Sequence, residues 1–399
     1  RGPDDKGFYN DEYISLAFNR LSILDLKNGN QPNKRDHIIS IFNGEIYNFK
    51  EIRKKLIKKN INFKSNSDTE VILESYKFWG LDFIKKSRGM FAFALWDSVK
   101  KKLILVRDPF GIKPLYYSKK NGIYYFASQV KSILSTNSIN SNYSDAGVVS
   151  YYLWGNIQEP YTLYKDIKSL KRGTCLSINA DGVEEEYNYA DIKNTILNSN
   201  ALNLKDSEEK QLYLQNIVNE TVEYHQVSDV PLSVLLSSGI DSNVILGSIG
   251  DNYKKNCSAL TVDFKFKSDI DEVPLAKQSA FMNKIPHKIE EIPNDDLFNH
   301  FKFFFKNMDL PTNDGFNNYL VSYLAKKNNS KIILSGIGGD ELFFGYPSFT
   351  IIPKIIKIVN FFPKSNRINN FFRKIIYPLL KKNFRKTKYA GVYEYGKNI

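Results

Sequence analysis

The sequence predicts two halves of different fold class, an α+β half followed by an α/β half with a parallel sheet. Between residues 8 and about 130, strand-like segments enclose two helical stretches, 48–60 and 68–80. Beyond residue 206, short apolar segments alternate with helix-length segments, which is typical of βαβ units. A chain of 399 residues suits two or three domains. We therefore expect a β-rich domain with helices and then a doubly wound parallel sheet.

The first half combines strand patterns with two local turn and cap signals. Strands are expected within residues 15–26, 37–49, 91–106 and 122–128. Asn43-Gly44, flanked by alternating apolar residues, predicts a type I′ hairpin turn. Asp68 is expected to be the N-cap of the helix 68–80.

The middle of the chain is expected to connect the two halves. Polar runs at 135–144 and 194–205 bracket a strand-like section. The predicted division is 1–136 for the first domain, 137–205 for the connecting segment and 206–399 for the second domain.

The segment VPLSVLLSSGIDS, which ends at Ser242, runs a continuous apolar strand into a turn of small residues. Such a strand is buried on both faces, and the helix expected at 243–249 starts directly after the turn. Amides at a helix N-terminus favour an anion, so the turn suits phosphates, with Asp241 able to hold magnesium. The alternative is an ordinary βα turn in which Asp241 or Ser242 caps the helix.

A second segment of the same design, KIILSGIGGDELFFGY, covers residues 331–346. It also runs from an apolar strand through a Gly-rich turn to acidic residues. In an open α/β sheet the ligand lies outside the carboxyl ends of the strands. We therefore expect Asp241 and Asp340 to share a magnesium pyrophosphate.

Composition excludes several other classes. No apolar run approaches the length of a membrane span, so we expect a soluble, cytoplasmic protein without integral membrane association. Cys175 and Cys257 have no CxxC spacing and no histidine cluster beside them, and are expected to be structural thiols.

The net charge of +13 comes mostly from residues 342–393, which hold eleven Lys or Arg and no acid. That segment could be a basic amphipathic segment that contacts a membrane surface or an anionic acceptor. The alternative, which we favour, is a helical insertion with a solvated, Lys-rich face. No aromatic-interleaved basic motif indicates nucleic-acid binding.

Eight ordered segments resemble the glutamine-hydrolysing asparagine synthetases, over nearly the whole chain. They are RGPDD (1–5), NRLSILDL (19–26), FNGEIYNF (42–49), SDTEV (67–71), RGMFAFALWD (88–97), RDPFGIKPLYY (107–117), SSGIDS (237–242) and SGIGGDELFFGY (335–346). Eight ordered matches are far more specific than any single one. The resemblance implies a glutaminase-like domain of the Ntn-hydrolase type, followed by an ATP-pyrophosphatase domain of the adenine nucleotide alpha hydrolase type.

For the first domain, the resemblance implies a glutamine site. Asn43 and the Gly44 amide would form the oxyanion hole, and Arg20, Asn43, Glu45 and Asp68 would bind glutamine. These residue types suit the chemistry, because an oxyanion needs fixed donors, Arg clamps a carboxylate, and two carboxylates hold an ammonium group.

For the second domain, the resemblance implies ATP and magnesium. Magnesium would bind to Asp241 and Asp340. ATP and pyrophosphate would bind to Leu236, Ser237, Ser238, Gly239, Asp241, Ser242, Val262, Ser335 and Gly336. Asp271 and Glu272 are weaker candidates, since they also suit the acidic first turn of a helix at 271–282.

The implied reaction adenylates aspartate with ATP, releases pyrophosphate, and forms an amide with ammonia from glutamine. Small molecules are the expected partners, and a homodimer is among the assemblies considered. The family's nucleophile is a cysteine at the mature amino terminus, whereas this chain begins at Arg1. We therefore expect both ends to be truncated, and free ammonia to replace glutamine for the chain as given.

Three substitutions depart from the family pattern. Ser238 replaces a glycine at a position expected to favour positive φ, Gln129 replaces a glutamate, and Ile337 replaces a glutamate thought to assist amide formation. Ile337 keeps open a related amidotransferase with another carboxylate acceptor, such as a surface polysaccharide. A non-catalytic nucleotide- or glutamine-binding remnant is the third hypothesis.

Overall fold

The computed structural model describes residues 2–199, 204, 206–263, 272–292 and 294–361. The chain divides into two compact units, Arg1–Ser335 and Gly336–Ile399. No helix within the described ranges is long and apolar enough to cross a membrane.

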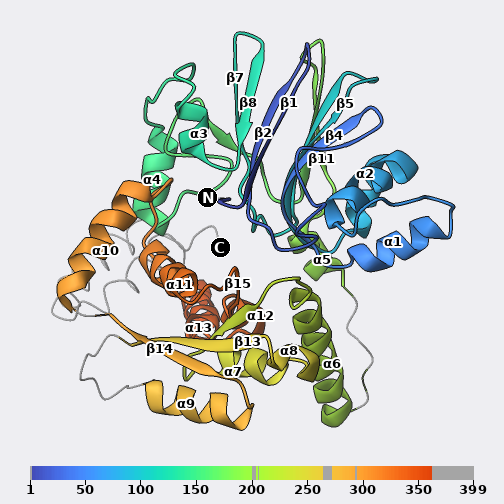
Figure 1. Cartoon of the computed structure of the whole chain (residues 1–399). Coiled ribbons are helices and arrows are strands. Elements are labelled where there is room, and N and C mark those ends of the chain that lie inside the picture. Colours follow the sequence, from blue (N-terminus) through green and yellow to red (C-terminus); the bar gives the residue numbers. More distant parts are fainter. Residues whose placement is uncertain (1, 200–203, 205, 264–271, 293, 362–399) are drawn as a thin grey trace, which may run out of the picture. The chain divides into compact units, whose positions relative to one another are not determined.

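The first half is built on a six-stranded antiparallel sheet (Figure 1). In spatial order its strands are β11 (Glu184–Asn188), β10 (Thr174–Asn179), β6 (Lys102–Arg107), β5 (Gly89–Asp97), β4 (Ile38–Ile46) and β3 (Asn33–Arg35). The central strand β5 pairs with β4 on one side and β6 on the other. The strands expected within 37–49 and 91–106 are confirmed.

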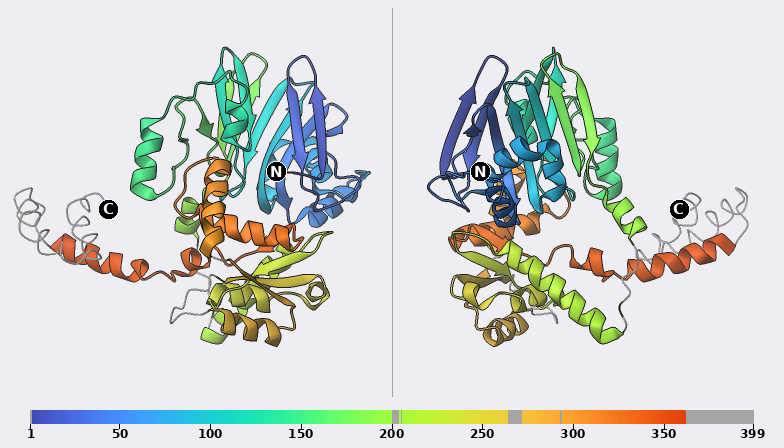
Figure 2. Two further views of the ribbon diagram at one scale, coloured as in Figure 1. Left: turned by 60° about the vertical axis from the view of Figure 1, so that its left-hand side comes forward. Right: turned by 90° about the vertical axis from the view of Figure 1, so that its right-hand side faces the viewer.

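The two faces of this sheet carry different layers because side chains alternate along β5. Phe91, Phe93 and Leu95 pack against α1 (Phe49–Ile57), α2 (Asp68–Trp79) and the 3-10 helix η1 (Gly80–Lys86). Ala92, Ala94 and Trp96 belong to the core on the opposite face. That core also takes in residues of β2 (Ser15–Arg20), which pairs with β1 (Asp5–Asn10), and of the β7–β8 pair (Tyr116–Lys120, Ile123–Ala127) (Figure 2).

The segment expected to connect the halves contributes strands of its own. β9 (Lys168–Ser169) pairs with β7, and β10 pairs with β6 of the large sheet. The same region carries α4 (Asp145–Trp154) and α5 (Ile192–Asn198), after α3 (Val130–Leu134). The division at residues 136 and 205 stays a prediction.

The second half contains a four-stranded parallel sheet, which confirms the expected α/β class. Its order is β14 (His287–Glu291), β13 (Cys257–Asp263), β12 (Leu232–Leu235) and β15 (Ile332–Leu334). One face packs against α6 (Ser207–His225), α7 (Ile240–Gly247) and α9 (Val273–Met282), and the other against α11 (Gly315–Lys327). The helices α8 (Asp251–Lys254) and α10 (Asn294–Asn307) also belong to this half.

The strand order of this sheet reverses at one point. β12 comes first in sequence, and its neighbours are β13, the next strand, and β15, the last. The order along the chain therefore reverses between β12 and β15, and ligands bind outside the carboxyl ends of strands at such a point.

The second unit contains α12 (Gly339–Phe343) and α13 (Ser348–Phe361). Most of the basic segment expected to form a helical insertion, from residue 362 onward, lies outside the described residues. Within the described part, α13 confirms a helix in this segment.

Two local expectations in the first half are wrong. Asn43-Gly44 is not a hairpin turn, because both residues lie inside β4 and pair with Ala92 and Phe91 of β5. The N-cap of α2 is Ser67 rather than Asp68: the Ser67 side chain accepts a hydrogen bond from the Glu70 amide, and Asp68 is the first helical residue.

Cys175 and Cys257 are buried and unpaired, as expected of structural thiols. Burial raises the pKa of each thiol to about 12, so both stay protonated at neutral pH.

Candidate functional site

The expected oxyanion residues lie next to each other in the middle of β4. Gly44 has φ of +146°, and a Cβ atom there would come within 2.1 Å of the Met90 carbonyl oxygen on β5. Only glycine fits this close approach of two backbones. The structure therefore explains why a glycine follows Asn43 without invoking a turn.

Asp68 lies beside the end of this strand. It is 5% exposed, and its carboxylate accepts a hydrogen bond of 3.1 Å from the Ile46 amide. Its position at the start of α2 favours a negative charge. The fold thus brings Asp68 and the β4 segment Asn43–Ile46 together from separate parts of the sequence.

Asp68 is buried and Glu45 is half-buried, and the two acids act on each other's ionisation. Burial raises the pKa of Glu45 well above its usual range, and the neighbouring charge of Asp68 raises it further. Burial also raises the pKa of Asp68 to about 6, although backbone amides and Arg20 act in the opposite direction. Two neighbouring carboxylates that resist ionisation favour a cation beside them, and an ammonium group supplies one.

Arg20 is also buried, and it holds the loop formed by residues 24–30. Its Nη2 atom donates to the carbonyls of Leu24 at 2.9 Å and Asp25 at 2.8 Å, and Nη1 donates to Asn30 Oδ1 at 3.1 Å. A Cβ atom on Gly29 would lie 2.3 Å from Nη2. Nη1 also donates to the Leu26 carbonyl at 3.4 Å, so the protons of both Nη atoms are used within this loop. The role of Arg20 as a carboxylate clamp stays a prediction.

Sequence reasoning missed two residues here, Asp108 and Lys113. Asp108 is fully buried, and its carboxylate accepts backbone N–H groups from Phe91, Phe110, Ile112 and Lys113 at 2.9 to 3.2 Å. These bonds shape the loop 108–113. Burial lowers the pKa of Lys113, while the charges of Glu45 and Asp108 act to raise it, so Lys113 provides positive charge near the acid pair. The segment 107–117 carried part of the resemblance, but nothing in its spacing indicates this interaction.

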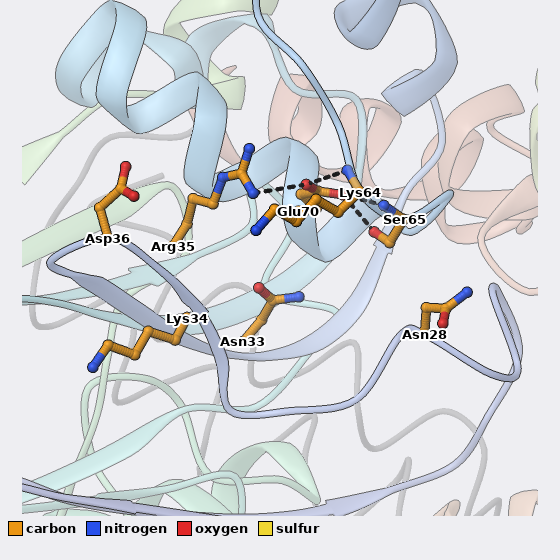
Figure 3. Close-up of a pocket in the computed structure, with 8 residues that line it drawn as sticks. All are labelled: Asn28, Asn33, Lys34, Arg35, Asp36, Lys64, Ser65 and Glu70. Atoms are coloured by element: carbon orange, nitrogen blue, oxygen red, sulfur yellow. Dashed lines mark hydrogen bonds and ion pairs between the residues drawn. The ribbon is translucent and has the colours of Figure 1, made fainter.

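A polar cavity of about 310 Å³ lies where the start of α2 meets β3 (Figure 3). Within it the Glu70 carboxylate accepts bonds from the amides of Lys64 and Ser65, at 2.8 and 2.7 Å, and lies 4.0 Å from Arg35 Nη1. Arg35 also donates to Glu74 at 2.6 Å. Because these charged groups satisfy each other, we read the cavity as support for the start of α2.

In the second half, the expected phosphate loop follows β12 and is held by its own side chains. The Ser242 hydroxyl accepts a hydrogen bond of 3.2 Å from the Ser237 amide, and the Ser237 hydroxyl accepts one of 3.1 Å from the Gly239 amide. Asn243 Nδ2 donates to the Gly239 carbonyl at 2.7 Å. The N-cap of α7 is Gly239, so the alternative with Asp241 or Ser242 as cap is wrong. Ser238 is not among the residues with positive φ, so the cost expected for it does not arise.

Three of the expected nucleotide residues lie on or directly after strands of the parallel sheet. Leu236 follows β12, Ser335 follows the adjacent β15, and Val262 lies on β13. Gly336, Ile337 and Asp340 belong to the second unit, where Asp340 is in the first turn of α12 and Ile337 is 76% exposed. A magnesium ion shared by Asp241 and Asp340 stays a prediction.

The remaining candidates are less informative. Asp271 lies outside the described residues, and Glu272 is the exposed N-cap of α9 rather than part of its first turn. Gln129 is the extended N-cap residue of α3. In the described ranges, no group of three or more His, Cys, Asp or Glu side chains could hold a metal ion.

Comparison with known proteins assigns each half of the chain to a known domain family. Residues 1–190 match the family model of the glutamine amidotransferase domain, and residues 214–392 match that of asparagine synthase. Asparagine synthetase [glutamine-hydrolyzing] 1 of Bacillus subtilis is 35% identical over 353 residues, which are 87% of this chain and 54% of that protein. A Methanocaldococcus jannaschii protein, provisionally named glutamine-hydrolysing asparagine synthetase 2, is 32% identical over 87% of this chain and 70% of its own length. A Gibberella zeae protein named Amidase chry2 is 28% identical over 88% of this chain and 54% of its own length.

The chain spans little more than half the length of the first relatives it matches. A solved Bacillus subtilis glutamine phosphoribosylpyrophosphate amidotransferase covers 65% of this chain at 14% identity, with a TM-score of 0.28. A TM-score this low supports no conclusion.

A glutamine amidotransferase domain that precedes a parallel-sheet asparagine synthase domain defines a two-domain class of protein, and the expected domain order is thereby confirmed. Within that class, this chain belongs to the family of glutamine-hydrolysing asparagine synthetases.

Proposed function

We propose that the protein is a glutamine-dependent asparagine synthase. In this reaction ATP adenylates the side-chain carboxylate of aspartate and releases pyrophosphate. Ammonia from glutamine then attacks the acyl-adenylate, which yields asparagine and AMP. The observation that carries the proposal is the position of the loop Ser237–Ser242. This loop leads from β12 into the N-terminus of α7, at the point where the strand order of the parallel sheet reverses, in a chain of this family.

On the glutamine side, the neighbouring acids Glu45 and Asp68 support the binding of an α-ammonium group. Glu45 and Asp68 would share its positive charge, and Arg20 would hold the α-carboxylate from the loop that it already organises. Asn43 and the Gly44 amide would donate to the oxyanion. Because Gly44 is fixed against β5, its amide needs no rearrangement during the reaction.

On the nucleotide side, the amides and hydroxyls of Ser237–Ser242 would bind phosphate oxygens at the N-terminus of α7. Leu236, Val262, Ser335 and Gly336 would hold the AMP moiety. Magnesium often binds through one or two carboxylates together with substrate phosphates. Two single carboxylates, Asp241 and Asp340, fit that mode of binding, and magnesium would neutralise charge on the pyrophosphate.

A second candidate is an amidotransferase of the same chemistry that acts on another carboxylate. Ile337 favours it, because an exposed isoleucine at this position can transfer no proton. The similarity to Amidase chry2 also shows that relatives of this chain carry other names.

The test measures AMP formed from ATP by the protein produced with its natural ends, with ammonium present. Aspartate, glucuronic acid and no acceptor are compared. Stimulation by aspartate alone supports the asparagine synthase, whereas stimulation by glucuronic acid alone favours the second candidate. AMP at background level with both acceptors would contradict the asparagine synthase.

We also propose a cytoplasmic location and a homodimer. The proposed substrates are cytoplasmic small molecules, and sedimentation of the purified protein tests the dimer.

A further inference from the structure

Side chains hold both polar groups of the peptide that joins Leu236 to Ser237. This peptide carries the chain from β12 into the phosphate loop. The Thr261 hydroxyl on β13 donates to the Leu236 carbonyl at 2.7 Å, and the Ser237 amide donates to Ser242 Oγ at 3.2 Å. The direction of the chain is therefore fixed before the loop begins.

A histidine is hydrogen-bonded to Thr261. His287 Nε2, at the start of β14, lies 2.8 Å from Thr261 Oγ1. A carbonyl oxygen can only accept, so the single hydroxyl proton of Thr261 points to Leu236. His287 Nε2 must then carry a proton and donate it to Thr261. The bond directions run from His287 through Thr261 to Leu236.

This assignment leaves His287 Nδ1 as an unprotonated acceptor. In the described part of the chain, that atom is buried and has no hydrogen-bond partner. Burial lowers the pKa of His287, and the nearby charge of Lys277 lowers it further, so the ring stays neutral. A buried acceptor without a partner is unfavourable and calls for an explanation. The mechanism proposed above uses neither His287 nor Thr261.

We propose that Thr261 and His287 are positioning residues that set the phosphate loop for ATP by fixing the Leu236 carbonyl. Thr261 is 3% exposed, and its side chain acts on the loop through the backbone of Leu236. His287 acts through Thr261. The inference rests on the proposed function, because it assigns the loop to ATP, but the geometry that it explains is independent of which carboxylate is the acceptor.

The first test separates ATP binding from turnover in the protein with its natural ends. Thr261→Val keeps the shape of the side chain and removes the hydroxyl, whereas Thr261→Ser keeps the hydroxyl. His287→Leu removes the donor, whereas His287→Gln offers an amide N–H in its place. We expect Thr261→Val and His287→Leu to raise the KM for ATP about tenfold, the effect of one lost hydrogen bond, with kcat little changed. The Ser and Gln variants should stay close to wild type.

The second test needs no turnover. Amide hydrogen exchange of residues 236–243 is measured without nucleotide, together with Tm. We expect Thr261→Val to speed exchange in this segment alone, and Thr261→Ser to leave it unchanged.

These results also separate this inference from the proposed function. If no acceptor stimulates AMP formation by the wild type, the proposed function fails, and the exchange pattern still decides whether Thr261 holds the loop. Equal KM and equal exchange for Thr261→Val and Thr261→Ser would overturn the inference. A fall in Tm with faster exchange throughout the chain would overturn it as well, since that result indicates a general structural role.

Discussion

The Ile46 amide donates a 3.1 Å hydrogen bond to the Asp68 carboxylate, and this bond joins strand β4 to the first turn of α2. Through it, the backbone segment that holds Asn43 and Gly44 is tied to an acid that lies beside Glu45. The proposed oxyanion donors and the proposed ammonium site are therefore parts of one rigid arrangement.

The Asp68 pKa predicts a dependence of stability on pH. Its pKa rises from 3.8 to about 6 on folding, so the folded state binds more protons than the unfolded state between these values. The contribution of Asp68 is fully present below about 4 and is lost as the pH rises towards 6. The high pKa of Glu45 extends this loss to higher pH.

The check is the free energy of urea unfolding at pH 4 to 8 for the wild type and Asp68→Asn. Asparagine keeps an oxygen that can accept the Ile46 amide. We expect the wild type to lose stability relative to Asp68→Asn as the pH rises through 6. A constant difference across this range would contradict the pKa assignment.

Gly44→Ala is expected to destabilise the first half strongly. The added Cβ would lie 2.1 Å from a backbone oxygen of β5, which cannot move without breaking the sheet. We expect a loss of about 3 kcal/mol or more in the free energy of unfolding. Gly122→Ala is the control: Gly122 also has positive φ, at +79°, but nothing lies within 4 Å, so about 1 to 2 kcal/mol is expected. Equal losses would show that the close approach does not matter.

Gly29→Ala should separate glutamine binding from stability. Its Cβ would lie 2.3 Å from Arg20 Nη2 and 2.9 and 3.0 Å from the carbonyl oxygens of Asp25 and Leu24, so Arg20 and the loop that it holds must both shift. We expect a loss of about 2 kcal/mol in stability and, in the protein with its natural ends, a clear rise in the KM for glutamine, because the guanidinium moves. Gly80→Ala, at φ +58° with open space around it, is the control for stability. An unchanged KM for Gly29→Ala would argue against Arg20 as the carboxylate clamp.

Asp241→Asn tests the proposed magnesium ligand. The substitution removes a charge that would hold magnesium against the pyrophosphate, so we expect AMP formation to fall about a hundredfold at fixed magnesium. The measurement is the rate of AMP formation against magnesium concentration. Asp251→Asn, another first-turn acid that pairs with Lys254 in α8, should leave this curve unchanged. Identical curves for the two variants would remove Asp241 from the site.

The sequence allowed the parallel sheet to be predicted because several of its strands are largely apolar. VPLSVLLS and KIILS are mostly apolar, and they contain the neighbouring strands β12 and β15. Their carboxyl ends carry the turns of small residues, so the edge of the sheet at which a ligand would bind was also predictable.

Local signals failed where the deciding partner is far away in sequence. Asn43-Gly44 has the composition of a hairpin turn, but glycine is needed there because of the Met90 carbonyl on β5. Ser67 and Asp68 are both good caps, and only the geometry chooses Ser67. Lys113 and His287 gain their proposed roles from residues on other strands and loops, which spacing along the chain does not reveal.

The most direct test of the central claim follows oxygen from aspartate into AMP. The protein with its natural ends is given ATP, ammonium and aspartate whose side-chain carboxylate carries ¹⁸O. An acyl-adenylate transfers one of these oxygens to the phosphate of AMP, so the account predicts one ¹⁸O atom in each AMP formed together with asparagine. Asparagine formed with unlabelled AMP, or no aspartate-dependent AMP at all, would contradict the account.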